Sequence, residues 1–253
     1  MSNAIETRGL TKRFKDFTLG PLDLKLPEGC ILGLIGENGA GKTTAIKLLL
    51  GILEPDSGTA SVLGRDISGD MSQVKEELGV VLDEPGLPEK LTVGQLGKIM
   101  PSIYKSWSRE DFAAYIRRLE LPEDKAYRDF SRGMKMKLGL ALAMSHKPRL
   151  LLLDEATSGL DPVARDDLLE LFLALARREG RSILFSTHIT SDLDSCADDI
   201  TYLQGGRVLQ SRDKAGFLRA FDHLKRPEDT GALTLEQIMI RTERGARDDD
   251  AAL

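Results

Sequence analysis

The sequence predicts a mixed α/β fold with a β-rich start and a helical segment inserted into its core. Three observations lead to this expectation. A glycine-rich loop at residues 36–43 follows a short apolar run and precedes a helical pattern. Strand and helix patterns alternate again after residue 150. Between residues 88 and 147, by contrast, apolar residues recur at helical spacing, so we expect a helical subdomain there.

The glycine-rich loop contains each residue type that a bound polyphosphate needs. Glycines lack a Cβ atom, so backbone N–H groups can converge on phosphates. Lys42 supplies a charge for the β- and γ-phosphates, and the Thr43 hydroxyl can ligate Mg²⁺. A chance glycine-rich turn would not need the buried strand before it and the helix after it. We therefore expect a nucleoside triphosphate to bind at Gly36, Glu37, Asn38, Gly39, Ala40, Gly41, Lys42, Thr43 and Thr44.

The first part of the chain is predicted to be mainly β-structure. Residues 22–26 alternate apolar and polar side chains, which is typical of a half-buried strand. Further strands are expected at residues 59–63 and 78–82. In the inserted segment, Ser108 is placed to cap one helix and Ser131 to begin another.

The C-terminal half returns to alternating strands and helices. Strands are predicted at residues 150–153 and 182–186, and Asp161 begins a helix between them that ends at Gly180. A hairpin is expected around Gly205 and Gly206. We expect residues 1–240 to form one ATP-binding domain and residues 241–253 to form a flexible acidic tail.

Composition excludes several classes of protein. The 253 residues carry a net charge of 35 − 40 = −5, which argues against a general nucleic-acid binder. Cys30 and Cys196 lie in no metal-ligand spacing, so we expect buried free thiols in a reducing cytosol. The N-terminus lacks a signal-peptide pattern. Apolar runs are far shorter than the ~20 residues of a membrane helix. We therefore expect a soluble chain whose membrane role, if any, is peripheral.

Two carboxylates end the apolar run at residues 150–153. The carboxyl edge of an open parallel sheet is where such folds bind ligands. Asp154 suits the Mg²⁺ shell, because Mg²⁺ prefers oxygen ligands and keeps several waters. Glu155 is placed to orient or deprotonate the water that attacks the γ-phosphate. By itself the pair is equally compatible with an ordinary acidic strand end; the phosphate loop upstream favours the catalytic interpretation.

His188 follows the strand predicted at residues 182–186. A single histidine is usually structural, but this position at the end of a strand favours a γ-phosphate contact. His146 and His223 have no comparable context, and we interpret them as surface or packing residues.

Taken together, these residues resemble the ATP-binding subunits of ABC transporters. The resemblance covers roughly residues 5–210 and is greatest to exporter ATPases found beside GntR-type regulators in antibiotic or acetoin-related operons. Its motifs lie in the family's order at residues 36–43, 131–135, 154–155 and 158–161 and at His188.

The resemblance implies a P-loop NTPase core with an N-terminal antiparallel β-subdomain and an inserted α-helical subdomain. It also implies ATP and Mg²⁺ as cofactors and a head-to-tail dimer, formed by two copies or with a paralogue. Each ATP would lie between one subunit's phosphate loop and the Ser131 helix of the other. Residues 131–134, with Ser131 and Gly133 among them, would face the partner's γ-phosphate, and Asp161 would lie at the dimer seam. Phe14 would stack on adenine, although a phenylalanine in a β-rich segment is otherwise a core residue.

The sequence departs from the family's pattern at two positions that touch the site. Arg132 stands where the family has glycine, so its backbone either avoids a glycine-only conformation or is strained, and its guanidinium could reach a phosphate or carboxylate across the seam. Asp83 replaces the family's magnesium-contacting glutamine. It is retained as a candidate metal ligand beside Thr43 and Asp154, with Glu84 as a rival.

The leading function is an ATP-hydrolysing motor that drives export through separate membrane permease subunits, from the cytoplasmic face of the membrane. Glu155, His188 and Lys42 would carry the catalysis. Residues 83–90 are expected to dock the permease, with residues 104–107 as further candidates. The alternatives are a non-transport ABC ATPase and a low-turnover regulatory subunit; no nucleic-acid partner is expected. The cargo is not encoded in this chain.

Overall fold

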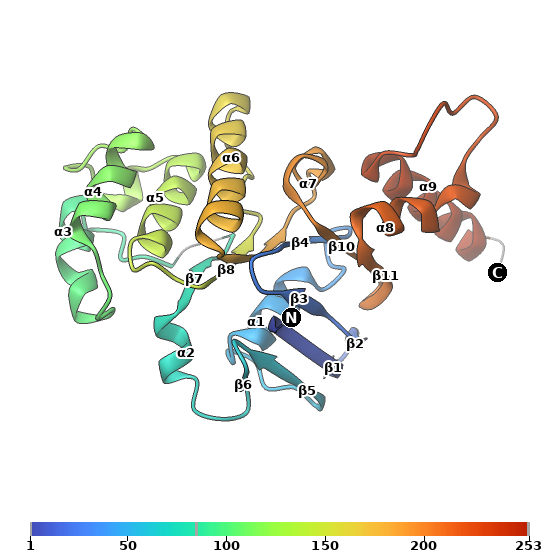
Figure 1. Cartoon of the computed structure of the whole chain (residues 1–253), viewed down its shortest axis with the longest axis horizontal. Coiled ribbons are helices and arrows are strands. Elements are labelled where there is room, and N and C mark those ends of the chain that lie inside the picture. Colours follow the sequence, from blue (N-terminus) through green and yellow to red (C-terminus); the bar gives the residue numbers. More distant parts are fainter. Residues whose placement is uncertain (1, 84–85, 252–253) are drawn as a thin grey trace.

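The computed structural model describes residues 2–83 and 86–251, which form two β-sheets and three groups of helices (Figure 1). The predicted mixed α/β fold with a helical insertion is confirmed. None of the helices in the described part of the chain is both long and apolar enough to cross a bilayer. Cys30 is partly buried and Cys196 is buried, and both are free thiols.

The larger sheet has six strands in the order β11-β10-β4-β9-β8-β7. Only the hairpin partner β11 runs antiparallel to its neighbour. Every residue of β4, β8 and β9 is buried, because helices or the second sheet cover both faces. The parallel strands all end at one edge, so their carboxyl ends deliver the functional residues to one place. The strands are β4 Ile31–Ile35, β7 Leu78–Val81, β8 Leu150–Asp154, β9 Ser182–Ser186, β10 Asp199–Gln204 and β11 Arg207–Asp213.

The smaller sheet is antiparallel. Helix α1 lies between it and the larger sheet (Figure 1). The expectation of one strand at residues 22–26 is wrong. The Thr7 hydroxyl donates to the oxygen of Leu22 and accepts from the backbone N–H of Leu24, each at 2.8 Å, and this insertion divides the strand. The strands are β1 Asn3–Arg13, β2 Thr18–Leu22, β3 Lys25–Pro27, β5 Ser57–Val62 and β6 Arg65–Asp66.

The inserted helical segment lies between β7 and β8, at the left of Figure 1. It has its own apolar cluster, centred on Phe112, Phe130 and Leu138. The predicted caps are confirmed: Ser108 accepts from the backbone of Asp111 at 3.1 Å, and Ser131 accepts from that of Met134 at 3.3 Å. The helices are α3 Val93–Ile99, α4 Arg109–Arg118 and α5 Arg132–Met144, with 3₁₀ turns at Met100–Ser102 and Tyr127–Asp129.

The remaining helices cover the sheets. Helix α1 packs between the two sheets through Ile46 and Leu49, and α6 packs against the other face of the large sheet through Phe172 on Phe185. These helices are α1 Lys42–Leu49, α2 Ser72–Glu76, α6 Pro162–Glu179, α7 Thr190–Cys196, α8 Lys214–Ala220 and α9 Leu235–Ala251, with a 3₁₀ turn at Asp222–Leu224.

Helix α9 runs from Leu235 to Ala251, through much of the segment for which a flexible acidic tail is expected. Leu235 and Ile238 anchor the start of α9 in the main core. Arg241 forms an ion pair with Asp229 in which both side chains are at most 13% exposed. The helix therefore extends beyond the boundary that the polar composition suggested.

Candidate nucleotide-binding site

The phosphate loop joins β4 to α1, and packing fixes its shape. A Cβ on Gly36 would lie 2.3 Å from the backbone oxygen of Leu203 on β10, so only glycine fits there. Gly41 caps α1 with a φ of 106°, a left-handed conformation that favours glycine. The Lys42 ammonium donates to the backbone oxygens of Gly36 at 2.7 Å and Glu37 at 3.2 Å. The loop and its lysine thus form one rigid unit.

Asp154 is fully buried at the end of β8 and joins the phosphate loop to β9. It accepts a hydrogen bond from the Thr43 hydroxyl at 2.6 Å and another from the Ser186 hydroxyl. The predicted metal ligands Thr43 and Asp154 therefore lie side by side, although 111 positions separate them in the sequence.

Glu155 lies between the other two predicted catalytic residues. Its Oε1 is 3.8 Å from the Lys42 ammonium, and its Oε2 is 2.5 Å from Nδ1 of His188. A carboxylate only accepts, so Nδ1 carries the proton in this contact. Glu155 has a φ of +54°, rare for a residue with a side chain, which turns it off the end of the strand. The structure thus brings Lys42, Glu155 and His188 together.

Burial decides the electrostatics of this group. The Lys42 side chain is only 7% exposed and that of Glu155 12%. Burial lowers the pKa of Lys42, while the neighbouring Glu155 and Asp154 carboxylates oppose this shift. We call Lys42, Thr43, Asp154 and Glu155 the floor of the site.

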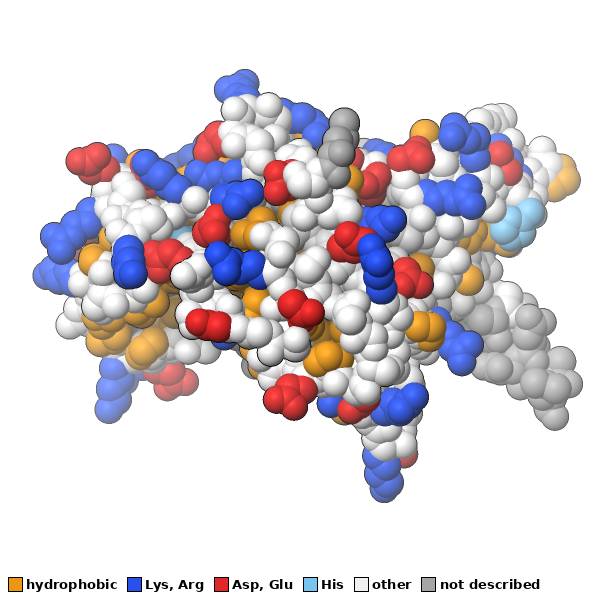
Figure 2. All heavy atoms as spheres, turned by 60° about the horizontal axis from the view of Figure 1, so that its bottom comes forward, with side chains coloured by type: hydrophobic (Ala, Val, Ile, Leu, Met, Phe, Trp, Pro, Cys, Tyr) orange, Lys and Arg blue, Asp and Glu red, His pale blue; other side chains and the backbone are white. Residues whose placement is uncertain are grey.

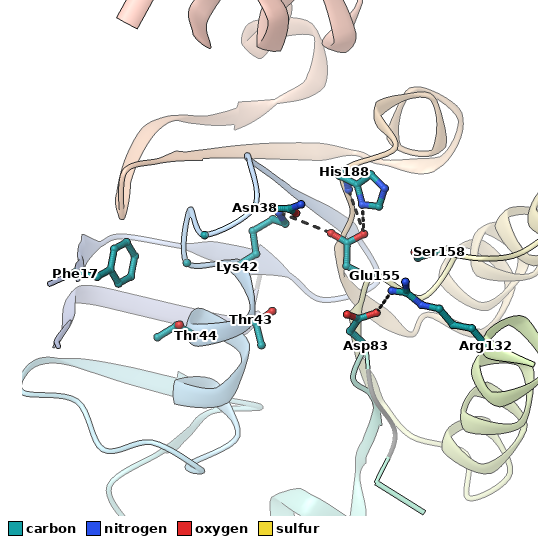
Figure 3. A pocket seen from close by; sticks show the side chains of 12 residues that line it. Phe17, Asn38, Lys42, Thr43, Thr44, Asp83, Arg132, Glu155, Ser158 and His188 are labelled. Carbon is teal, nitrogen blue, oxygen red and sulfur yellow. Dashed lines mark hydrogen bonds and ion pairs between the residues drawn. The ribbon is translucent and has the colours of Figure 1, made fainter. Parts of the chain in front are cut away.

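The floor opens into a cavity of about 600 Å³ (Figure 3). Asn38, Gly39, Gly41 and Thr44 line it from the phosphate loop, and His188 and Ser158 line it from the opposite side. Its far wall carries Asp83, two residues after β7, and Arg132, the first residue of α5. We call this pair the lip.

The two lip residues form an ion pair with each other (Figure 3). Arg132 lies in α5 and has no positive φ. Its backbone is therefore not in a conformation that only glycine adopts, and it is not strained in the way that the substitution of a glycine could have required. The carboxylate that it reaches belongs to its own chain. Asp83 is engaged by this guanidinium, and Glu84 lies outside the described residues.

Ser131, Gly133 and Asp161 are not among the described residues that line this cavity. Ser131 caps α5, and Asp161 caps α6 by accepting from the backbone N–H of Ala164 at 3.0 Å. That hydrogen bond lowers the pKa of Asp161. Gly133 packs so closely on the next loop that a Cβ would lie 2.7 Å from the oxygen of Gly159.

Sequence reasoning gave no nucleotide contact to two residues that line the cavity, although it placed one of them, Ser158, in a family motif. Phe17 lines it, whereas Phe14 is 44% exposed and does not, although the two rings lie 6.3 Å apart. Ser158 also lines it. The position of Ser158 just after the two carboxylates was a usable signal. The sequence around Phe17 gave no signal of this kind, because only the turn after β1 brings Phe17 to the cavity.

The oxygen ligands at the floor of the site fit Mg²⁺. A hydroxyl and a carboxylate converge beside the loop that would hold the phosphates, and Mg²⁺ is typically bound by one or two such ligands plus phosphate oxygens and water. Among the described residues no group of three or more His, Cys, Asp or Glu side chains could hold a metal. A site completed by substrate oxygens is therefore the better fit than an all-protein cage.

Comparison with known proteins identifies the family. Residues 19–158, over half of the chain, match the family described as ABC transporter. This chain belongs to that family. It is an ATP-binding subunit of an ABC transporter and hydrolyses ATP.

Individual relatives agree with this assignment. The bacitracin transport ATP-binding protein of Enterococcus faecalis is 33% identical over 83% of this chain and 69% of its own length. The daunorubicin/doxorubicin resistance ATP-binding protein of Streptomyces peucetius is 34% identical over 82% of this chain and 64% of its own. A solved ATP-binding subunit of an ABC transporter has a TM-score of 0.81 at 27% identity, with 94% and 98% of the two chains covered.

Proposed function

We propose that this ABC ATPase works as one half of a head-to-tail pair that powers export through separate permease subunits at the inner face of the cell membrane. The observation that carries the proposal is a division within the site. The groups for phosphate and water chemistry, Lys42, Glu155 and His188, share one cavity, whereas Ser131 and Gly133 lie outside it. Ser131 and Gly133 lie at the start of a 13-residue helix, where free N–H groups and the helix dipole favour an anion. In a pair, they would face the partner's γ-phosphate.

The chain's own residues have distinct roles in hydrolysis. Lys42 and the loop N–H groups hold the β- and γ-phosphates. Glu155 accepts the proton of the attacking water, and the His188 contact holds its carboxylate in position. Thr43 and Asp154 would hold Mg²⁺, which neutralises charge on the phosphates. Phe14 and Phe17 are the candidates for stacking on the adenine, and Asp161 would lie at the seam of the pair.

Glu155→Gln tests the assignment of the base. The amide cannot take up the proton, so steady-state ATP hydrolysis should fall about 10²- to 10⁴-fold. ATP should still bind, and an ATP-bound pair should accumulate and be visible by analytical ultracentrifugation. Glu170→Gln, an exposed change on α6, is the matched control. Undiminished hydrolysis in the Glu155→Gln protein would remove Glu155 from this role.

We propose export because of the relatives' names. Those names refer to bacitracin transport and to daunorubicin and doxorubicin resistance. The first name describes transport of an antibiotic, and the second describes resistance to a drug, which a transporter provides by removing the compound from the cell. Transport assays in inverted vesicles containing the permease would decide the direction: ATP-dependent accumulation inside them supports export, and ATP-dependent release contradicts it.

The permease contact is proposed at residues 86–90 rather than at residues 104–107. A groove of about 540 Å³ runs beside the first segment and is lined by Leu87, Glu89 and Lys135. The rings of the second segment are committed to packing: Tyr104 stacks on His146 at 3.9 Å, and Trp107 lies 5.1 Å from Phe112. Single cysteines at residues 86–90 should crosslink to a cytoplasmic loop of the permease. Failure under every nucleotide condition would count against docking here.

A further inference from the structure

A buried hydrogen bond connects the two segments of the chain that carry Glu155 and His188. The Thr157 hydroxyl donates to a carboxylate oxygen of Asp192 at 2.6 Å. Both residues are buried, with exposed fractions of 0% and 1%. Thr157 is the second residue after Glu155, and Asp192 is the fourth residue after His188. This hydrogen bond and the contact between Glu155 and His188 therefore close a ring through two short pieces of backbone.

The Glu155 side of the ring needs support from its surroundings. Glu155 has a φ of +54°, a conformation that a residue with a side chain keeps only when neighbouring contacts hold it there. Its N–H donates to the backbone oxygen of Ser186 at 3.0 Å, and its oxygen accepts from the N–H of Ser158 at 2.9 Å. These bonds tie the loop to β9 and to itself. The Thr157 hydroxyl adds the tie to α7.

The His188 side of the ring receives little support from packing. His188 lies between the end of β9 and the start of α7, and its side chain is 52% exposed. The position of its imidazole therefore depends on the backbone that joins these two elements and on the contact with Glu155. Asp192, in the first turn of α7, anchors that backbone to the loop that follows β8.

Stability alone gives no reason for a carboxylate at this position. Burial raises the pKa of Asp192, and the hydrogen bond from Thr157 opposes this shift. Arg165 and His188 face the same carboxylate and oppose the shift as well. An apolar pair of the same shape would hold α7 against the loop without a buried charge. A hydrogen bond, however, fixes both distance and direction, whereas apolar burial is not directional.

We propose that Asp192 is a positioning residue for ATP hydrolysis, which keeps the Glu155 carboxylate on the His188 imidazole through its hydrogen bond with Thr157. Asp192 is not among the described residues that line the nucleotide cavity, so it acts through these residues and not on the nucleotide. It holds the loop after β8 and the start of α7 at a fixed separation. The inference rests on the proposed function, because it takes Glu155 as the base.

Thr157→Val tests the link, since it removes the hydroxyl and keeps the shape of the side chain. In the full-length protein, kcat for ATP should fall about tenfold to a hundredfold, the cost of a small misplacement of a catalytic group. KM for ATP should change by less than about twofold, because Lys42 and the phosphate loop keep their contacts. Thr157→Ser keeps the hydroxyl and should keep kcat. An unchanged kcat in Thr157→Val would overturn the proposal, as would equal losses in the two variants.

Thr201→Val is the matched control. Thr201 is buried, and its hydroxyl lies 2.8 Å from that of Ser211, in a contact that joins β10 to β11 and lies in neither segment of the ring. The variant loses a buried hydroxyl in the same way and should keep kcat. A loss of kcat equal to that of Thr157→Val would show a general effect of removing a buried hydroxyl, and it would contradict the proposal.

The double variant Thr157→Val/Asp192→Leu separates positioning from stability. Replacement of both partners by apolar groups of similar shape is close to neutral for folding, so urea denaturation should show a smaller loss than in Thr157→Val alone. Its kcat should nevertheless stay low, because the directional hydrogen bond is still missing. Recovery of kcat together with stability would show that Asp192 only supports the fold, and it would overturn the proposal.

A Glu155→Gln background shows whether the link acts through the base. Groups that act as one unit have non-additive effects, so Thr157→Val should lower the residual single-turnover hydrolysis of the Glu155→Gln protein no further. A second fall of the same size would contradict the proposal. Full activity of the Glu155→Gln protein would refute the base in the proposed function. An inactive Glu155→Gln protein beside a fully active Thr157→Val protein would refute only the role of Asp192.

Discussion

The floor and the lip of the nucleotide cavity use the same kinds of charged group in opposite ways. At the floor, Lys42 and Glu155 are at most 12% exposed, and backbone oxygens or a second side chain hold each of them. At the lip, Asp83 and Arg132 are 43% and 59% exposed and form an ion pair with each other. Burial makes the floor preorganised and costly to change, whereas exposure makes the lip adjustable. Substitutions at the floor should therefore have larger effects than substitutions at the lip.

Lys42→Ala should have the largest effect, because it removes the buried cation of the floor. ATP affinity should fall about a hundredfold, the value expected for losing charge-assisted hydrogen bonds to phosphate. Fluorescent-nucleotide titration measures it, and Lys47→Ala on the same helix is the control. If both variants bind ATP equally well, the floor does not hold the phosphates.

Ser186→Ala should reduce the stability of the floor itself. It leaves one oxygen of the fully buried Asp154 without its hydroxyl donor. The free energy of unfolding should fall by about 1–3 kcal/mol in urea denaturation. Ser68→Ala, which removes an exposed hydrogen bond to Asp66, should change it by less than about 0.5 kcal/mol. Equal losses would show that burial does not separate these hydrogen bonds.

His146 supports β7, the strand that leads to Asp83 at the lip, so its protonation should affect the stability of this part of the fold. Its Nε2 lies 2.9 Å from the oxygen of Leu78 on β7, and burial lowers its pKa below the ordinary 6.5. The unfolded chain then takes up a proton at a higher pH than the folded one. The free energy of unfolding should therefore be highest above pH 6.5 and should decrease as the pH falls below it, by at most about 1.4 kcal/mol per pH unit. His146→Gln should flatten this dependence in urea denaturation between pH 7 and 5, whereas an unchanged slope would assign it to other groups.

Asp83→Asn should have the smallest effect on folding. The exposed ion pair contributes less than about 1 kcal/mol to the free energy of unfolding, and added salt should reduce that further. Denaturation at low and high salt measures both. A loss as large as that of Ser186→Ala would mean that the lip is as rigid as the floor.

The floor was predictable from the sequence. Gly36 to Lys42 has the composition of a phosphate loop, and Asp154, Glu155 and His188 follow apolar runs that read as buried strands. Parallel strands end at one edge, so their terminal residues meet whatever the details of packing. The lip was not predictable as a pair. Asp83 and Arg132 were noticed separately, and 49 positions and two other helices separate them.

By itself, the sequence determined the fold class, the phosphate loop and the identity of the groups at the floor, because local composition and strand periodicity encode them. Only the tertiary structure decided that Arg132 pairs with Asp83, that Phe17 lines the cavity, and that α9 extends into the polar terminus. These depend on how the helical segment and the turns pack against the sheets, and contacts between distant segments leave no periodic signal in the chain.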